Sequence, residues 1–149
     1  MKKVFLLTSA FIFSLAVLAQ PKADDVLKVN TEKYEFGKIK QGVPVTTYLE
    51  LKNLGNMPLV IENVTASCGC TTPEKPKEPI MPGQTYKLKV DYNAAAMGSF
   101  VKDVNIKIAG IELPKVVKIA GEVISAEAYD AYTKEKEKEK VKNNGKSGK

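Results

Sequence analysis

Residues 85–92 read Thr-Tyr-Lys-Leu-Lys-Val-Asp-Tyr, and no other part of the chain shows its structure so clearly. Apolar and polar side chains alternate along this stretch, which is the period-two pattern of a half-buried β-strand. Three more stretches repeat the alternation, and their inward positions are Val45, Thr47, Leu49 and Leu51, then Phe100, Val104, Ile106 and Ile108, then Leu113, Val117, Ile119 and Val123. No amphipathic helix competes with these strands. We therefore expect one all-β domain over residues 26–125.

Turn residues separate the expected strands. Asn53-Leu54-Gly55-Asn56 and Gly110 mark two turns, and Met81-Pro82-Gly83-Gln84 places proline and glycine where a type II turn needs them. Such short connections favour antiparallel neighbours, so we expect an antiparallel β-sandwich of roughly seven strands. Between residues 72 and 83 four prolines exclude a central strand and leave an extended loop, with Ile80 anchoring it to the core.

The two ends of the chain differ from this body. Residues 1–19 combine Lys2 and Lys3 with an apolar run and small residues before Gln20, the layout of a secretory signal peptide. We expect export to the periplasm or the extracellular space, with cleavage and no stable membrane insertion afterwards; an uncleaved anchor is the alternative. Residues 126–149 are rich in alternating lysine and glutamate and carry no core-forming pattern, so we expect a charged, largely disordered tail.

Composition excludes several kinds of site. The chain has no histidine, so neither a Ser-His-Asp triad nor a closed Cys/His zinc site is available within one molecule. Loss of the signal peptide lowers the formal charge from +6 to +4, and much of the remainder lies in the tail. No basic face argues for nucleic acid. We expect no cofactor, no enzymatic activity other than a thiol-disulfide exchange, and an unidentified protein partner.

The only two cysteines, Cys68 and Cys70, flank a single glycine. A disulfide between them would close a very small ring, worth only about 1.6 kcal/mol by chain entropy, and would require a bend that Gly69 permits. Redox chemistry is one interpretation, in which Lys75 or Lys77 lowers a thiol pKa if the loop folds back. Binding of Cu(I) with help from Met57, Met81 or Met97 is another. The third is that both cysteines are small apolar residues without further consequence.

Several sequence blocks resemble a known family. They are Phe36-Gly37-Lys38-Ile39 with Gly42, Leu49 to Gly55, Pro58 to Ile61, Ser67-Cys68-Gly69-Cys70-Thr71, Pro79 to Gly83, and Gly121-Glu122-Val123. Over about residues 31–123 they resemble the bacterial exported domain family of unknown function 1573. The resemblance implies an immunoglobulin-like sandwich, related in fold to major sperm protein and Hydin-type domains. It also implies that the block from Ser67 to Thr71 is a family hallmark, without an established role.

These observations predict an exported, non-enzymatic, immunoglobulin-like module for binding or assembly. Its functional end would combine the Cys68/Cys70 loop with the proline-rich segment from Pro73 to Pro82, because loops and strand edges are where such sandwiches bind. A redox protein or disulfide switch is the alternative, and Cu(I) binding is the third hypothesis. The motif residues placed at this end are Ser67, Cys68, Gly69, Cys70, Thr71, Pro79, Pro82 and Gly83.

Overall fold

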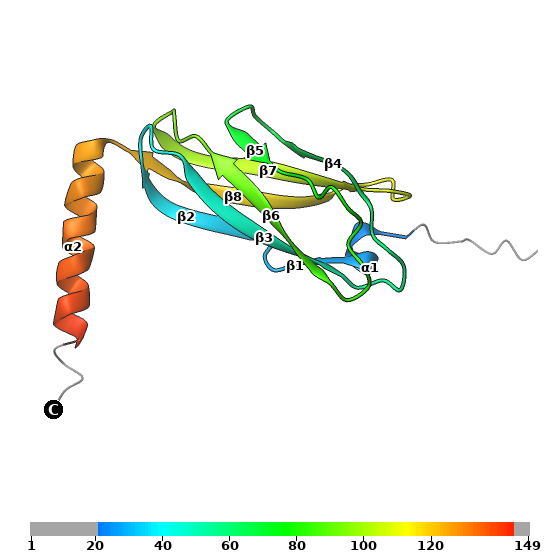
Figure 1. Ribbon diagram of the computed structural model, residues 1–149. Helices are drawn as coiled ribbons and strands as arrows, with labels where there is room; N and C mark the ends of the chain where they lie inside the picture. The colour runs from blue at the N-terminus through cyan, green and yellow to red at the C-terminus, as the bar shows by residue number, and fades with distance from the viewer. Residues whose placement is uncertain (1–20, 145–149) are drawn as a thin grey trace, which may run out of the picture.

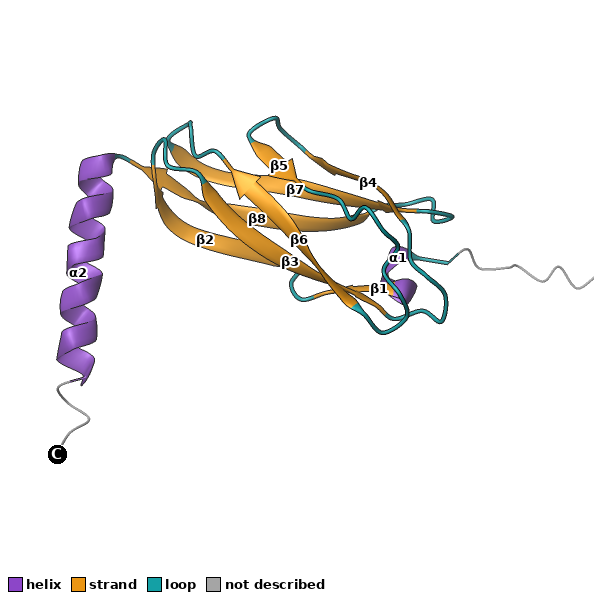
Figure 2. Cartoon of the chain, viewed as in Figure 1, coloured by secondary structure: helices purple, strands orange, loops and turns teal. Residues whose placement is uncertain are grey.

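A computed structural model describes residues 21–144, so the expected signal peptide lies outside the described residues. Within these residues the chain forms eight strands and two helices (Figures 1 and 2). Their bounds are α1 Ala23–Val26, β1 Leu27–Val29, β2 Lys33–Lys40, β3 Val45–Asn53, β4 Ile61–Ala66, β5 Thr71–Pro73, β6 Thr85–Tyr92, β7 Gly98–Ile108, β8 Lys115–Ile124 and α2 Ala126–Asn144.

The strands form two four-stranded sheets that pack face to face. One sheet has the order β1-β3-β6-β5 and the other has the order β2-β8-β7-β4. Most neighbouring strands are antiparallel, as expected, but β2 and β8 pair in parallel. The antiparallel expectation was wrong for this pair because residues 30–32 carry the chain from one sheet to the other. Two strands that are neighbours in sequence, β1 and β2, therefore have no pairing with each other.

The core lies between the inner faces of the two sheets, where alternation predicted it. Leu88 and Val90 on β6 and Val104 and Ile106 on β7 are fully buried, and Ile80 anchors its loop with only 4% exposed. One inward assignment was wrong: Leu113 is 75% exposed. It belongs to the turn before β8, and Lys115 takes the first buried position of that strand.

The Lys115 side chain ends among carboxylates. Its ammonium group contacts Asp24 Oδ1 at 2.5 Å and Glu32 Oε1 at 2.7 Å. Burial lowers the pKa of Lys115, but the hydrogen bonds to Asp24 and Glu32 outweigh burial, so the pKa is raised overall. These two ion pairs join α1 and the β1–β2 connection to the start of β8.

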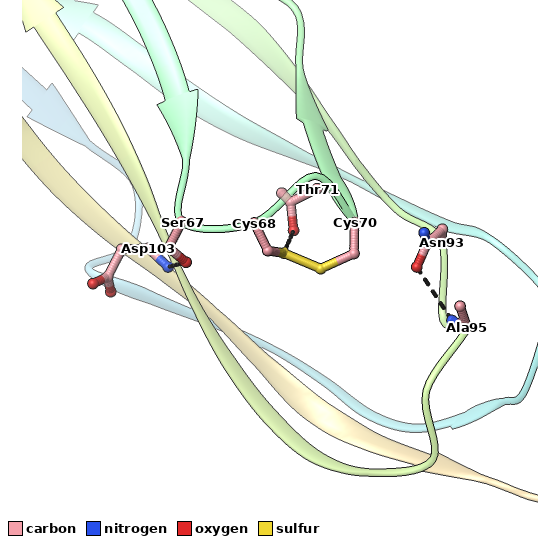
Figure 3. Close-up of a disulfide and its surroundings, with 7 residues drawn as sticks. All are labelled: Ser67, Cys68, Cys70, Thr71, Asn93, Ala95 and Asp103. Atoms are coloured by element: carbon pink, nitrogen blue, oxygen red, sulfur yellow. Dashed lines mark hydrogen bonds between the residues drawn. A yellow bond between two sulfur atoms is a disulfide. The ribbon is translucent and has the colours of Figure 1, made fainter.

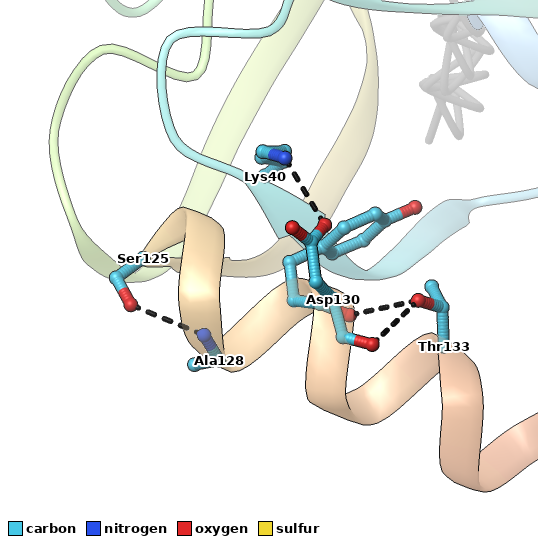
Figure 4. Close-up of polar contacts among 6 residues, drawn as sticks. Lys40, Ser125, Ala128, Asp130 and Thr133 are labelled. Carbon is cyan, nitrogen blue, oxygen red and sulfur yellow. Dashed lines mark hydrogen bonds and ion pairs between the residues drawn. The ribbon is translucent and has the colours of Figure 1, made fainter.

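The charged tail is helical where we expected disorder. Ser125 supplies the N-cap, with its hydroxyl accepting a hydrogen bond from the Ala128 amide at 3.3 Å (Figure 4). Alanine, glutamate and lysine are good helix formers. The helix α2 is about 28 Å long and projects away from the sandwich (Figure 1). Lys40 on β2 pairs with Asp130 at 3.0 Å, and Lys38 lies 5.1 Å from the ring centre of Tyr132. These contacts tie only the first turns of α2 to β2.

Among residues 21–144, no helix is long and apolar enough to cross a membrane.

Candidate functional site

The two cysteines lie in the crossover between the sheets. The crossover joins β4, an edge strand of one sheet, to β5, an edge strand of the other. Cys68 and Cys70 form a disulfide with their Cα atoms 5.3 Å apart (Figure 3). The Thr71 amide donates a hydrogen bond to the Cys68 carbonyl at 3.3 Å, which closes a tight turn around the pair. A short covalent ring therefore forms the link between the two edge strands.

Backbone hydrogen bonds hold both sides of the disulfide turn, at Ser67 and at Cys70. The Ser67 amide donates to the Asp103 carbonyl at 2.9 Å, and the Asp103 amide donates to the Ser67 hydroxyl at 3.0 Å (Figure 3). These two bonds extend the β4–β7 ladder by one residue. On the other side, the Asn93 amide donates to the Cys70 carbonyl at 3.0 Å. The turn is thus fixed to β7 and to the end of β6.

The two sulfurs have different surroundings. Both cysteine side chains are partly buried, and Cys70 packs against the hydrophobic core. The Cys68 sulfur lies 3.7 Å from the hydroxyl of Thr71, which is itself buried. Hydroxyl groups stabilise a thiolate by hydrogen bonding. If the disulfide were opened, Cys68 would therefore be the sulfur with a hydrogen-bond partner already in place.

The bend between the two cysteines does not require glycine at position 69, contrary to our expectation. The φ of Gly69 does not lie in the left-handed region, and an added Cβ would meet nothing within 4 Å. The backbone does bend between the cysteines, but a residue with a side chain could make the same bend. The glycine keeps the outer face of the turn free of a side chain.

Ala94, beside the site, adopts a backbone conformation that the sequence did not reveal. It has a φ of +51° and is fully buried in the β6–β7 loop, one residue after the Asn93 that bonds to Cys70. Left-handed geometry at a residue other than glycine costs free energy and persists only where its surroundings hold it. Here the Gly42 amide donates to the Ala94 carbonyl at 2.9 Å and the Asn93 carboxamide accepts from the Ala95 amide (Figure 3). Alanine has no preference for the left-handed region, so the sequence contained no sign of this conformation at position 94.

The proline-rich motif lies at the other end of the sandwich. Gly83, with a φ of +75°, forms the expected turn, closed by a hydrogen bond from the Gln84 amide to the Met81 carbonyl at 3.0 Å. This turn precedes β6, whereas the disulfide lies beyond its last residue, so the length of β6, roughly 23 Å, separates them. The prediction that Pro79, Pro82 and Gly83 share one end with the cysteines is wrong. Only Pro73, in β5, stays near them.

The lysines proposed to tune the thiols also lie away from them. Lys75 donates to the carbonyl of Glu62, at the far end of β4, at 2.9 Å. Lys77 lines a groove of about 590 Å³ between the proline-rich loop and the start of β6. The loop does not fold back toward the sulfurs, so the structure gives neither lysine the role we expected.

Two of the three methionines considered as Cu(I) ligands also lie at the end of the sandwich opposite the disulfide. Met57 precedes β4 and Met81 precedes β6, whereas Met97, 61% exposed, precedes β7 at the disulfide end. Within the described residues, no group of three or more histidine, cysteine, aspartate or glutamate side chains is placed to hold a metal ion.

A charge network covers the outer face of the sheet beside β5. Lys89 bridges Asp91 at 2.9 Å and Glu74 at 3.0 Å, and Thr46 donates to Asp91 at 2.5 Å. The hydrogen bond from Thr46, followed by the bond from Lys89, lowers the pKa of Asp91. The hydrogen bonds from Lys89 to Asp91 and to Glu74 raise the pKa of Lys89. Lys87, two residues earlier on β6, has only a 3.9 Å contact with Glu50.

Fold and site together define an immunoglobulin-like sandwich with a disulfide-closed crossover between its edge strands. Residues 27–123 match the family model described as a protein of unknown function, DUF1573. The chain belongs to this family, which confirms the resemblance seen in the sequence. No curated protein matches the chain.

Solved structures share the fold at low sequence identity. A protein of unknown function from Porphyromonas gingivalis W83 is 19% identical with a TM-score of 0.56, and the match covers 66% of this chain and 46% of that one. The PapD-like domain 7 of human CEP192 is 11% identical with a TM-score of 0.53, and coverage is 83% of this chain and 99% of that domain. The YadV chaperone is 17% identical with a TM-score of 0.50, with 66% and 52% covered. The chain thus spans less than half of the Porphyromonas protein.

Proposed function

We propose that this protein is an exported, non-enzymatic binding or assembly module that recognises another protein. The observation that carries the proposal is the position of the disulfide turn, which joins two edge strands at the end of the sandwich that also bears the β2–β3 and β6–β7 loops. Loops held by a rigid scaffold are the usual recognition elements of such domains. YadV, a chaperone by name, shares the fold. The signal-like residues 1–19 and the disulfide both support an oxidising compartment outside the cytoplasm.

Site-specific cross-linking in the producing organism tests the binding role. A photoreactive amino acid is placed at Val43 or Met97, which are 48% and 61% exposed at the disulfide end. Leu113, 75% exposed at the opposite end, is the matched control. We expect a discrete protein adduct from Val43 and Met97 that survives replacement of both cysteines by serine. Absence of an adduct from both Val43 and Met97, or an equal adduct from Leu113, would refute recognition at the disulfide end, and recovery of the protein in the cytoplasmic fraction would refute export.

A second candidate function is thiol-disulfide exchange, favoured by a disulfide whose side chains are only partly buried. In this reaction a dithiol partner protein would lose two electrons and become a disulfide, while Cys68 and Cys70 become two thiols. Equilibration with glutathione buffers, followed by alkylation and mass measurement, gives the potential of the pair. A potential near that of known exchange proteins, together with loss of activity in Cys68→Ser, would favour this function over the binding module. Resistance to reduction would dismiss it.

A further inference from the structure

The edge of β6 is only half covered. β5 pairs with Val90, Asp91 and Tyr92 and ends there. One further hydrogen bond, from the Glu74 amide to the Lys89 carbonyl at 3.0 Å, extends the contact by a residue before the chain leaves the strand. Along Thr85–Leu88, no strand in the described part of the chain pairs with the side of β6 that faces away from β3. This half of the strand is an open edge inside one sheet.

The hydrogen-bonding direction of this edge follows from the neighbouring bonds. The amide of Asn93 and the carbonyl of Lys89 both point toward the β5 side. Because backbone groups alternate along a strand, the amide and carbonyl of Lys87 point the same way. The carbonyl of Gln84 points to β3, where it accepts from the Asn53 amide at 3.0 Å, as the same alternation requires. Lys87 therefore presents one donor and one acceptor to whatever lies beside β6.

A groove lies next to the start of the open edge. The proline-rich loop moves away from β6 after Glu74, and at Ile80 it pairs with Leu59. Between the loop and β6 it leaves about 590 Å³, with Tyr86 and Ile80 among the lining residues. This volume lies in the range of ligand-binding clefts. Six prolines or charged residues of the loop, from Glu74 to Pro79, form the opposite wall.

We propose that this edge binds an extended segment of a partner protein, which adds a strand beside β6 in line with β5. The inference rests on the proposed role as a binding module and adds a second contact surface, on the half of β6 that lies away from the disulfide turn. Main-chain hydrogen bonds to Lys87 give the affinity, and alternate side chains give the specificity. Tyr86 and Leu88, which flank Lys87 on β6, face inward. The residues of the incoming strand that lie opposite Tyr86 and Leu88 are therefore apolar.

Charge selects the residue opposite Lys87. The Lys87 side chain is 70% exposed on the outer face, and its one carboxylate contact, to Glu50, is long. A carboxylate directly across the new pair would stabilise it, because opposite charges at facing positions attract. Pairing with a second copy through the same edge, centred on this residue, would instead place two Lys87 side chains opposite each other. The segment that fits reads apolar, acidic, apolar.

The probe is a synthetic Thr-Val-Glu-Val-Thr peptide, titrated into the full-length mature protein labelled with ¹⁵N. We expect saturable shifts of the amide signals from Thr85 to Lys89 and slower hydrogen exchange at the Lys87 amide. The charge-reversed peptide Thr-Val-Lys-Val-Thr should bind about fivefold more weakly. Absence of binding, shifts confined to the disulfide end, or self-association through β6 would each overturn the proposal.

Variants separate the backbone from the side chain. Lys87→Pro removes the outward amide, which an edge strand tolerates, and should abolish binding, while Lys87→Ala keeps the amide and should bind. Where Lys87→Pro does not fold, Lys87→Glu decides: it should prefer the lysine peptide over the glutamate peptide. Failure of that reversal refutes edge recognition. If Val43 still forms its cross-linked adduct in these variants, the proposed binding module stands even where edge recognition fails. If neither Val43 nor Met97 forms an adduct in the wild-type protein, the module itself is refuted.

Discussion

Asn53 is the buried polar residue on which the far end of the sandwich depends. Its carboxamide donates to the carbonyls of Met57 at 2.8 Å and Ile80 at 2.7 Å, and accepts from the Gly55 amide at 2.8 Å. It is 1% exposed. Asn53→Asp keeps the shape but removes both donated bonds and leaves two carbonyls facing a carboxyl group. We expect a loss of about 3 kcal/mol in the free energy of unfolding, measured by urea denaturation.

Asn56→Asp is the control for this prediction, because Asn56 is exposed in the same turn. Its substitution should change the free energy of unfolding by less than about 0.5 kcal/mol. Equal effects at the two positions would mean that the three bonds of Asn53 add no stability beyond that of a surface residue.

Replacement by alanine should destabilise the protein at Gly121 and have little effect at Gly69. An added Cβ at Gly121 would lie 2.9 Å from the Gly37 carbonyl oxygen and 3.0 Å from the Phe100 ring. Gly121→Ala should therefore cost about 1–3 kcal/mol. Gly69→Ala, with open space around it, should stay within about 0.5 kcal/mol of the wild type. Thermal unfolding of the two variants checks the pair, and a loss at Gly69 as large as at Gly121 would contradict this geometry.

The contact at Gly121 brings together two blocks of sequence that lie far apart in the chain. β2 bulges between Glu35 and Lys38, so that Phe36 and Gly37 lie opposite Gly121 on β8. The sequence contains both glycines, but their proximity depends on a parallel pairing that local patterns do not encode. Alternation predicted which side chains are buried, and it could not predict which strand lies beside which.

At the scale of elements, α2 is a projection rather than part of the core. Its described contacts with β2 are the Lys40–Asp130 ion pair and the approach of Lys38 to Tyr132, both at partly exposed side chains. Exposed pairs of this kind each contribute at most about 1 kcal/mol. Removal of residues 126–149 should leave the urea midpoint of the sandwich almost unchanged while the helical circular dichroism signal disappears. A large drop in the midpoint would show that α2 stabilises the sandwich.

The elements were predicted unevenly for physical reasons. Long alternating strands such as β6 were visible because one face is buried, which fixes the pattern. The helix was missed because its Lys/Glu repeat has no apolar face, although Ser125 before Ala126 and Glu127 is a recognisable N-cap signal. The separation of Gly83 from the cysteines was missed because proximity in sequence across residues 70–83 suggested one loop, and the loop instead runs back along β6 to the opposite end.

For the whole molecule, stability should come from the core between the sheets and not from the disulfide. Fully buried side chains from both sheets, among them Leu49, Leu88, Ile106 and Ile119, fill that core. Each is worth about 1.5–3 kcal/mol on burial, whereas closing a ring of this size contributes only about 1.6 kcal/mol. The double variant Cys68→Ser, Cys70→Ser should therefore fold, and should lose less than about 2 kcal/mol in urea denaturation.

The reduced wild type separates the covalent bond from the cysteine side chains in this experiment. If the bond alone matters, reduction should lower the free energy of unfolding as much as the double variant does. Ile119→Ala, which empties part of the core without touching the crossover, should cost more than either, about 2–5 kcal/mol. A chain that unfolds on reduction would reverse this ranking and make the crossover a structural staple. Retention of the fold would instead leave the disulfide free to change its redox state while the two sheets, and the open edge of β6, stay in place.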